Sequence, residues 1–303
     1  EDVSKGFRDS DRGQLIMACG TGKTYTTLWI KEALNSKTTL ILLPSLSLLS
    51  QTLEEWYKAF KSPFEALCVC SDSTVTSRVD GLVETVSDIH FPTTTDPEII
   101  KKFLNRDVQK VVFSTYQSSP MIAEVFKDFK VRPFDLAIAD EAHRCTGDTT
   151  SAFTTIIDQN RIKANKRLFT TATPKTFGLY AHKKAESRDI EIADMNDESK
   201  FGNVFHKLLF SDAINYKPEP LLNDYRVVVI GVTEPMIADL IRERELLKLD
   251  NNEVIDAKSL ASQIGLLKAI KKYNLGKMIT FHSRVSMATK FATTLKSALE
   301  LVP

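Results

Sequence analysis

The segment "LIMACGTGKTYTTLWI", residues Leu15 to Ile30, carries the strongest structural signal in this 303-residue chain. It begins as an apolar run, passes through a glycine-rich loop that ends in Gly-Lys-Thr, and continues with apolar residues at helical spacing. Gly20 and Gly22 let the backbone turn sharply, which directs its N–H groups and the positive end of the following helix to one point. A strand, such a loop and a helix in this order predict a site for the phosphates of a nucleotide.

The side chains at the end of the loop have the chemistry that a phosphate site needs. Lys23 can reach the β- and γ-phosphates, and the Thr24 hydroxyl can hold Mg²⁺. Met17 stands where the general pattern has Gly or Ala, but it lies at the end of the strand, before the tight turn. We expect the phosphates to contact Gly20, Thr21, Gly22, Lys23 and Thr24, with Lys23 also in a catalytic role.

Apolar runs on both sides of this segment repeat the strand pattern. Helical spacing separates several of them, as at Tyr25–Leu34 and Leu46–Phe60, and Asp96 and Pro97 are typical of the start of another helix. Near-continuous apolar strands separated by helices indicate an α/β fold, with a parallel sheet that helices cover on both faces. The predicted strands are 14–18, 38–44, 65–70, 110–116, 134–140, 167–174, 225–232 and 277–282.

The segment "FDLAIADEAHR" holds a second candidate site. It places Asp140 and Glu141 at the end of a buried strand, where two adjacent acids are costly unless they bind a cation or do chemistry. We expect Asp140 to hold Mg²⁺, directly or through water, and Glu141 to position and deprotonate an attacking water. The alternatives are an acid pair that caps the next helix and, for His143, a satisfied polar residue beside the site. The phosphate loop upstream favours the catalytic interpretation.

Composition and length bound the class of protein. The chain is 43% hydrophobic and 26% charged, with a formal net charge of +1, so any surface for nucleic acid must be local. Its length suggests two domains of roughly 150 residues each.

The four cysteines lack the paired spacing of a zinc site, and we expect buried, reduced thiols in a cytosolic protein. No apolar run reaches the ~20 residues that a membrane helix needs, so no membrane partner is expected.

With both candidate sites in place, the sequence resembles the superfamily 2 helicases and translocases, the DEAH-type RecA-like motors. Six segments are similar to that family's motifs, in the family's order, and cover most of the chain. The residues in and around these segments resemble those of bacterial predicted helicases. Those helicases are related to restriction-enzyme motors and to helicases with a helicase-associated domain. The segments are "CGTGKT" (motif I, 19–24), "LLPSLSLLSQ" (Ia, 42–51), "STYQS" (Ib, 114–118), "DEAH" (II, 140–143), "TATP" (III, 171–174) and "ITFHSRV" (IV, 279–285).

The resemblance implies a role for each matching residue. It implies that Lys23, Asp140 and Glu141 hydrolyse ATP with Mg²⁺. It implies that His143, Thr171 and Thr173 couple the nucleotide state to the grip on nucleic acid. Short hydroxyl and amide side chains at strand ends bond phosphates without reading bases, although a core position is an equal alternative for Tyr116. The remaining implied contacts are Pro44, Ser45, Thr115, Tyr116 and Gln117 along a strand's phosphates, with Ser283 and Arg284 in the second motor domain.

The motif order also predicts the domain organisation. We expect a first RecA-like domain over residues 1–220, with motifs I to III, and an incomplete second RecA-like domain over 221–303, with motif IV. The polar segment 186–220 is predicted to connect them. Nothing in the sequence resembles the glutamine-containing adenine motif or motifs V and VI. We therefore expect a longer protein, with the rest of the second motor domain and candidate nuclease or recognition domains, and at most weak ATP hydrolysis by these residues alone.

The family resemblance implies a function. It implies a nucleic-acid-stimulated ATPase that moves along double-stranded DNA in a bacterial cytoplasm, with a restriction or phage-defence system as one setting. An RNA helicase is one alternative, and an ATP-gated clamp or sensor that grips nucleic acid without net movement is another. A small-molecule kinase is disfavoured by the DEAH and TATP segments.

Overall fold

The computed structural model describes residues 1–71, 91–178, 180, 187, 191–231, 246–248 and 254–299. The chain divides into two units, Glu1–Asp224 and Tyr225–Pro303, which are described one at a time. Among the described residues, no helix combines the length and the apolar character that spanning a bilayer requires.

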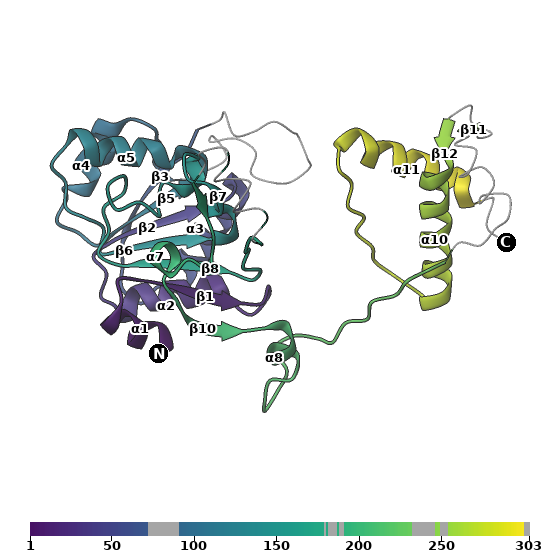
Figure 1. Cartoon of the computed structure of the whole chain (residues 1–303), viewed down its shortest axis with the longest axis horizontal. Coiled ribbons are helices and arrows are strands. Elements are labelled where there is room, and N and C mark those ends of the chain that lie inside the picture. The colour runs from purple at the N-terminus through teal and green to yellow at the C-terminus, as the bar shows by residue number, and fades with distance from the viewer. Residues whose placement is uncertain are drawn as a thin grey trace. The chain divides into compact units, whose positions relative to one another are not determined.

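An eight-stranded sheet forms the centre of the first unit (Figure 1). Every pair of neighbouring strands in it is parallel, which confirms the parallel sheet predicted from the apolar runs. The spatial order is β10-β1-β8-β6-β2-β5-β3-β4. The bounds are β1 (Arg12–Met17), β2 (Thr38–Leu43), β3 (Glu65–Val69), β4 (Thr93–Thr94), β5 (Lys110–Thr115), β6 (Leu136–Asp140), β8 (Arg167–Thr171) and β10 (Asn203–Leu208).

Helices cover both faces of this sheet because successive strand residues point to opposite sides. On β2, Ile41 and Leu43 pack into one apolar cluster with α1 (Asp2–Asp9), α2 (Lys23–Ala33) and α3 (Leu46–Ala59). Leu40 and Leu42 pack into the other. The helices of that second cluster are α4 (Pro97–Leu104), α5 (Ser119–Asp128) and α7 (Glu198–Phe201). As predicted, the Asp96 carboxylate accepts a hydrogen bond from a backbone N–H at the start of α4, 2.8 Å away.

Short elements connect the layers at the carboxyl ends of the strands. A 3-10 turn follows β5, another follows β6, and a small antiparallel ladder lies beyond them. These elements are η3 (Tyr116–Ser118), η4 (Ala142–Cys145), β7 (Gly147–Asp148), η5 (Ala152–Thr154), β9 (Ile192–Ala193) and α8 (Phe210–Ile214).

The segment predicted to connect two domains, 186–220, instead supplies the edge strand β10, so that prediction was wrong. β10 runs parallel to β1, with Gly13 opposite Asn203. The Phe205 ring lies where a side chain on Gly13 would have to be, 2.2 Å from an added Cβ. Gly202 turns the chain into β10 with a φ of 71°, and an added Cβ there would meet the Arg12 carbonyl oxygen at 2.2 Å.

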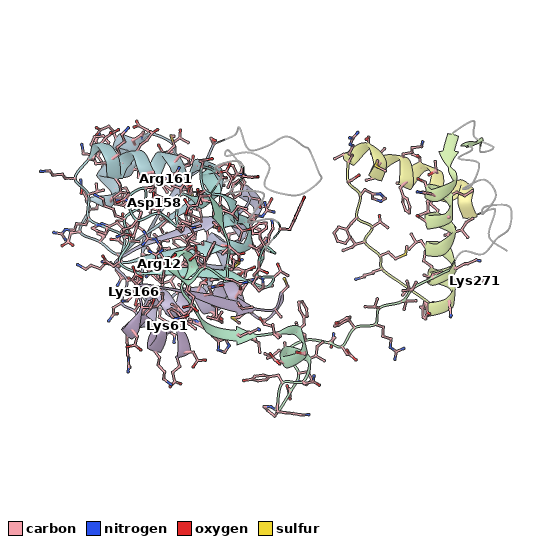
Figure 2. All side chains as sticks on the ribbon, in the orientation of Figure 1. Arg12, Lys61, Asp158, Arg161, Lys166 and Lys271 are labelled. Atoms are coloured by element: carbon pink, nitrogen blue, oxygen red, sulfur yellow. The ribbon has the colours of Figure 1, made fainter. Side chains whose placement is uncertain are left out.

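Two side chains at the starts of β1 and β8, Arg12 and Lys166, hold α7 and α1 against the sheet by hydrogen bonds to backbone carbonyls. Figure 2 labels both side chains. The Arg12 guanidinium donates to the carbonyls of Ser199 at 3.0 Å and Lys200 at 3.2 Å, both in α7. Lys166 donates to the Phe7 carbonyl of α1 at 3.3 Å, and its ammonium lies 5.6 Å from the Phe7 ring centroid.

The second unit contains two helices and a short antiparallel ladder in its described residues. The strands predicted at 225–232 and 277–282 were wrong: described residues 225–231 and 277–282 run without strand pairing, and residue 232 lies outside the described part. Val229 is 92% exposed and Phe281 is 91% exposed. An apolar run becomes a strand only where a neighbour accepts its backbone hydrogen bonds, so a second RecA-like sheet stays a prediction. The elements are β11 (Leu246–Lys248), β12 (Val254–Asp256), α10 (Ala257–Tyr273) and α11 (Val285–Leu299).

Candidate functional site

The glycine-rich loop lies between β1 and α2, at the carboxyl edge of the sheet. Gly20 and Gly22 have φ angles of 82° and 85°, in the left-handed region that favours glycine. The Thr21 hydroxyl closes the loop by donating to the Ala18 carbonyl at 2.7 Å. Gly22 caps the amino end of α2, which therefore starts at Lys23. The backbone thus has the strand, turn and helix start that the sequence predicted.

Lys23 and Glu141 lie together although 118 residues separate them in the sequence. The Lys23 ammonium is 3.2 Å from a Glu141 carboxylate oxygen, and the two side chains are 12% and 24% exposed. The strand order brings them together, because β8 alone separates β1 from β6. Glu141 itself adopts a left-handed backbone conformation, with a φ of 51° and a ψ of 48°. Such a conformation is strained for a non-glycine residue and persists only where surrounding contacts hold it.

Asp140 ends β6 with a half-buried carboxylate. The Thr170 hydroxyl, opposite it on β8, donates to one carboxylate oxygen at 2.7 Å. Burial raises the pKa of Asp140, while the hydrogen bond from Thr170 acts in the opposite direction. A desolvated carboxylate gains most from a hard cation, and the hydroxyl of Thr24, the other expected ligand, is of the kind that Mg²⁺ accepts. The donor set therefore fits Mg²⁺.

His143 connects the DEAH segment to the strand that carries TATP. Its Nδ1 lies 3.0 Å from the Thr171 hydroxyl and 3.3 Å from a Glu141 carboxylate oxygen. Thr171 also accepts the backbone N–H of Thr173 at 3.1 Å. Burial lowers the pKa of His143, which favours the neutral ring beside Lys23. The structure thus connects the three predicted coupling residues through hydrogen bonds and places the His143 ring 3.3 Å from the Glu141 carboxylate.

The predicted nucleic-acid contacts differ in exposure. Ser45 is exposed and caps α3, accepting the Leu48 N–H at 3.3 Å, whereas Pro44 is buried. Gln117 is exposed on η3, while Thr115 and Tyr116 are fully buried.

Full burial corrects the expectation that Thr115 and Tyr116 contact phosphates directly, and for Tyr116 it favours the core alternative. The Tyr116 hydroxyl donates to the Asp140 carbonyl at 2.6 Å.

The remaining residues named from the sequence are Ser283, Arg284 and the four cysteines. Ser283 and Arg284 belong to the second unit, immediately before α11. Of the four cysteines, Cys68, Cys70 and Cys145 are buried, but Cys19 is exposed in the glycine-rich loop, which corrects the expectation that all four are buried.

The sequence analysis missed Thr170. The doubled threonine in "RLFTTATP" was its only signal, and its role depends on the register between β6 and β8.

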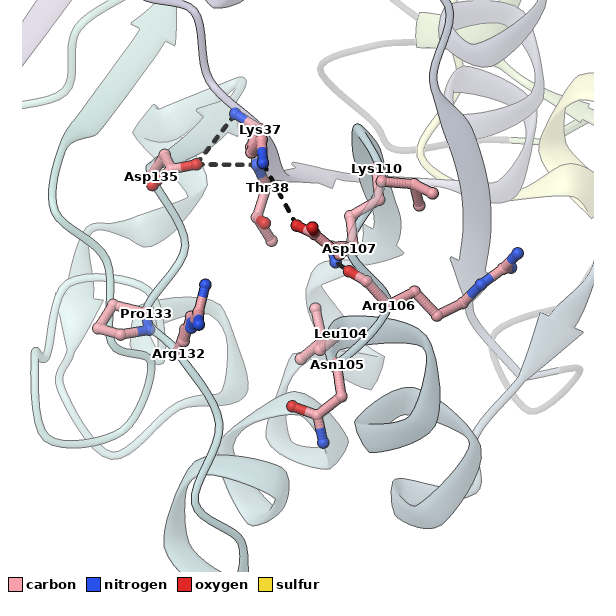
Figure 3. A pocket seen from close by; sticks show the side chains of 11 residues that line it. Lys37, Thr38, Leu104, Asn105, Arg106, Asp107, Lys110, Arg132, Pro133 and Asp135 are labelled. Carbon is pink, nitrogen blue, oxygen red and sulfur yellow. Dashed lines mark hydrogen bonds and ion pairs between the residues drawn. The ribbon is translucent and has the colours of Figure 1, made fainter.

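A pocket of about 530 Å³ lies at the opposite edge, before the starts of β2, β5 and β6 (Figure 3). Its polar groups bind one another. Asp135 accepts the backbone N–H of Lys37 at 2.9 Å, and the Lys37 ammonium lies 3.3 Å from Asp107. Lys110 donates to the Arg106 carbonyl just beyond α4, a position that a helix dipole favours for a cation. These contacts have a structural explanation, and we assign the pocket no ligand.

The family described as "Type III restriction enzyme, res subunit" matches residues 1–176. Probable helicase A859L of African swine fever virus, isolate Pig/Kenya/KEN-50/1950, is 28% identical over 301 residues, which is 97% of this chain and 30% of the relative. The same protein from isolate Tick/South Africa/Pretoriuskop Pr4/1996 is 36% identical over 170 residues, 56% of this chain and 18% of the relative.

Two solved structures of Type ISP restriction-modification enzymes are also similar. LlaBIII bound to DNA superposes with a TM-score of 0.75 and 29% identity, covering 99% of this chain and 21% of the enzyme. A nuclease-deletion mutant of LlaGI in complex with a DNA substrate mimic gives a TM-score of 0.55 and 37% identity, covering 71% of this chain and 17% of the enzyme. The chain thus spans less than a third of the length of each of these proteins. The curated relatives are viral, and a bacterial source stays a prediction.

Proposed function

The chain belongs to the family of type III restriction enzyme res subunits, as a superfamily 2 helicase related to restriction-enzyme motors, and from that premise we propose that it is the ATP-hydrolysing part of a translocase on double-stranded DNA. The first unit would bind the nucleotide. Turnover there would drive steps along the DNA backbone when a second motor domain opens and closes against it. A restriction or phage-defence system is the setting that the Type ISP neighbours support.

The nucleotide chemistry would be divided among four side chains. Lys23 would bind the β- and γ-phosphates, leaving its ion pair with Glu141 as it does so. Glu141 would then be free to orient a water molecule and accept its proton. Thr24 and Asp140 would hold Mg²⁺, which neutralises the charge that develops on the phosphates.

The nucleic acid would lie across the exposed polar residues at strand ends, which include Ser45 and Gln117. These groups suit phosphates and not base edges, so binding should be indifferent to sequence. The single observation that carries the proposal is the contact between Lys23 and Glu141. It brings the lysine of the glycine-rich loop and the proposed catalytic base into one site.

The test compares ATP turnover by the intact protein, second motor domain included, in three states: alone, with duplex DNA and with duplex RNA. We expect stimulation by DNA and its loss in Lys23→Ala, with Lys58→Ala as the matched control, since Lys58 is an exposed lysine paired with Glu54 at 3.7 Å. Movement is measured in parallel as ATP-dependent displacement of a triplex-forming third strand.

Each outcome of this test separates the alternatives. Triplex displacement without unwinding of a tailed duplex supports the translocase. Stimulation by RNA only would replace the DNA assignment with an RNA helicase. ATP-dependent retention on DNA without displacement would replace movement with a clamp.

A further inference from the structure

Tyr116 connects the turn after β5 to the backbone of the DEAH segment. Its hydroxyl donates to the Asp140 carbonyl at 2.6 Å. The ring stacks on Phe153, with 5.3 Å between centroids and 21° between planes. Burial raises the pKa of Tyr116 well above its ordinary value, so the hydroxyl remains a hydrogen-bond donor. A single orientation of this side chain is thus fixed from two sides.

The carbonyl that Tyr116 holds belongs to the peptide bond between Asp140 and Glu141. The orientation of this peptide sets the φ angle of Glu141, which is 51°. Because a left-handed conformation costs about 1–3 kcal/mol for most residues, the peptide would relax if the hydroxyl were removed. The Glu141 carboxylate would then leave its contacts with Lys23 and His143, at 3.2 and 3.3 Å.

The same turn carries an exposed polar residue. Gln117 follows Tyr116 directly and faces solvent. The turn is tied internally: the Ser119 hydroxyl donates to the Tyr116 carbonyl at 2.8 Å, and the Thr115 hydroxyl donates to the Ser118 hydroxyl at 3.2 Å. A ligand that displaces Gln117 therefore moves the turn as one piece, and Tyr116 with it.

Resting on the proposed function, we infer that Tyr116 is a positioning residue that ties the nucleic-acid-facing turn at Gln117 to the backbone of Glu141. Nucleic acid on the turn stabilises the peptide orientation that Glu141 needs. By linkage, nucleotide in the site changes the affinity of the turn for nucleic acid by the same factor.

The test measures this coupling as a ratio of two affinities. Duplex DNA binding by the purified protein is titrated with and without a non-hydrolysable ATP analogue, in wild type and Tyr116→Phe. The substitution keeps the stacked ring and removes only the donor. We expect the ratio to fall toward one, by about fivefold or more. A merely structural role would lower thermal stability and leave the ratio unchanged.

Tyr57→Phe is the matched control, because it removes a tyrosine hydroxyl that donates to a different carbonyl, that of Phe64, at 3.2 Å. A wild-type ratio in Tyr116→Phe would overturn the inference. Phe153→Leu removes the stacked ring and leaves the hydroxyl, so its ratio should stay near that of wild type. A ratio that falls toward one in Phe153→Leu would overturn the assignment of the coupling to the hydroxyl, even if Tyr116→Phe did not fold. A wild type whose DNA affinity ignores the nucleotide would instead contradict the proposed function.

Discussion

The Glu141 carboxylate contacts two different groups, the Lys23 ammonium and the His143 ring. The ion pair neutralises the lysine that phosphates would otherwise occupy. In the proposed mechanism, binding of phosphates to Lys23 would release the Glu141 carboxylate to act as the base for a water molecule. This exchange makes the state of Glu141 depend on whether the site is filled.

At this scale we expect Glu141→Gln to separate binding from chemistry. Glutamine keeps the shape of the side chain but cannot accept the proton, so turnover should fall by about 10²–10⁴-fold. Affinity for a fluorescent ATP analogue should be retained or increased, because Lys23 loses its competing partner. Glu54→Gln, at an exposed carboxylate, is the control. Near-normal turnover in Glu141→Gln would assign the water to another group.

The sequence was sufficient to place Lys23, Asp140 and Glu141 in one site, because the loop and the strand-end acids both require the carboxyl edge of a parallel sheet. It was not sufficient for Thr170 or for the role of Tyr116. A threonine can face either side of its strand, and a tyrosine suits a core or a surface equally well. Only the register and the packing distinguish these positions.

Among the elements, the central strands were predictable because both their faces are buried, which makes their sequences continuously apolar. β10 was not, since its edge position leaves exposed residues such as Val204 at 47%. The opposite error at 225–231 and 277–282 has a related cause: apolar composition does not provide a hydrogen-bonding neighbour. Strand predictions therefore failed where they depended on which strand pairs with which, and not on the strand propensity of the residues.

Arg167 stabilises the start of β8 through hydrogen bonds to backbone carbonyls. It is fully buried at the start of β8 and donates to the carbonyls of Ile156 at 2.8 Å, Ala164 at 3.2 Å and Ile162. Burial lowers its pKa to about 10, so it stays charged at neutral pH. Arg167→Ala leaves these carbonyls without this donor, and the free energy of unfolding should fall by about 3 kcal/mol or more.

Urea denaturation followed by circular dichroism measures this change. Arg132→Ala, at an exposed arginine, should stay within about 0.5 kcal/mol of wild type. Equal stabilities of the two variants would show that other groups satisfy the carbonyls around β8.

At the scale of the whole molecule, the division after Asp224 leaves the complete eight-stranded sheet in the first unit. We expect a polypeptide of residues 1–224 to unfold in one cooperative thermal transition, because both apolar clusters lie within it. A polypeptide of residues 1–201 is the control. It lacks β10, which pairs with β1, and should melt at a lower temperature or lose cooperativity.

A non-cooperative melt of residues 1–224 would mean that the first unit needs later residues to fold. Differential scanning calorimetry on both polypeptides distinguishes these outcomes.

The pairing of β1 with β8 and β10 also fixes when the site can form during translation. The strand that carries the phosphate loop is synthesised early, but its neighbours end at Thr171 and Leu208. At about 5–20 residues per second, the nascent strand waits roughly 10–40 s for its second neighbour. Until β8 is made, the apolar residues of β1 are available to chaperones, and until β10 is made, one edge of β1 stays unpaired. The strand that carries the glycine-rich loop therefore has both of its neighbours only once the ribosome has passed Leu208.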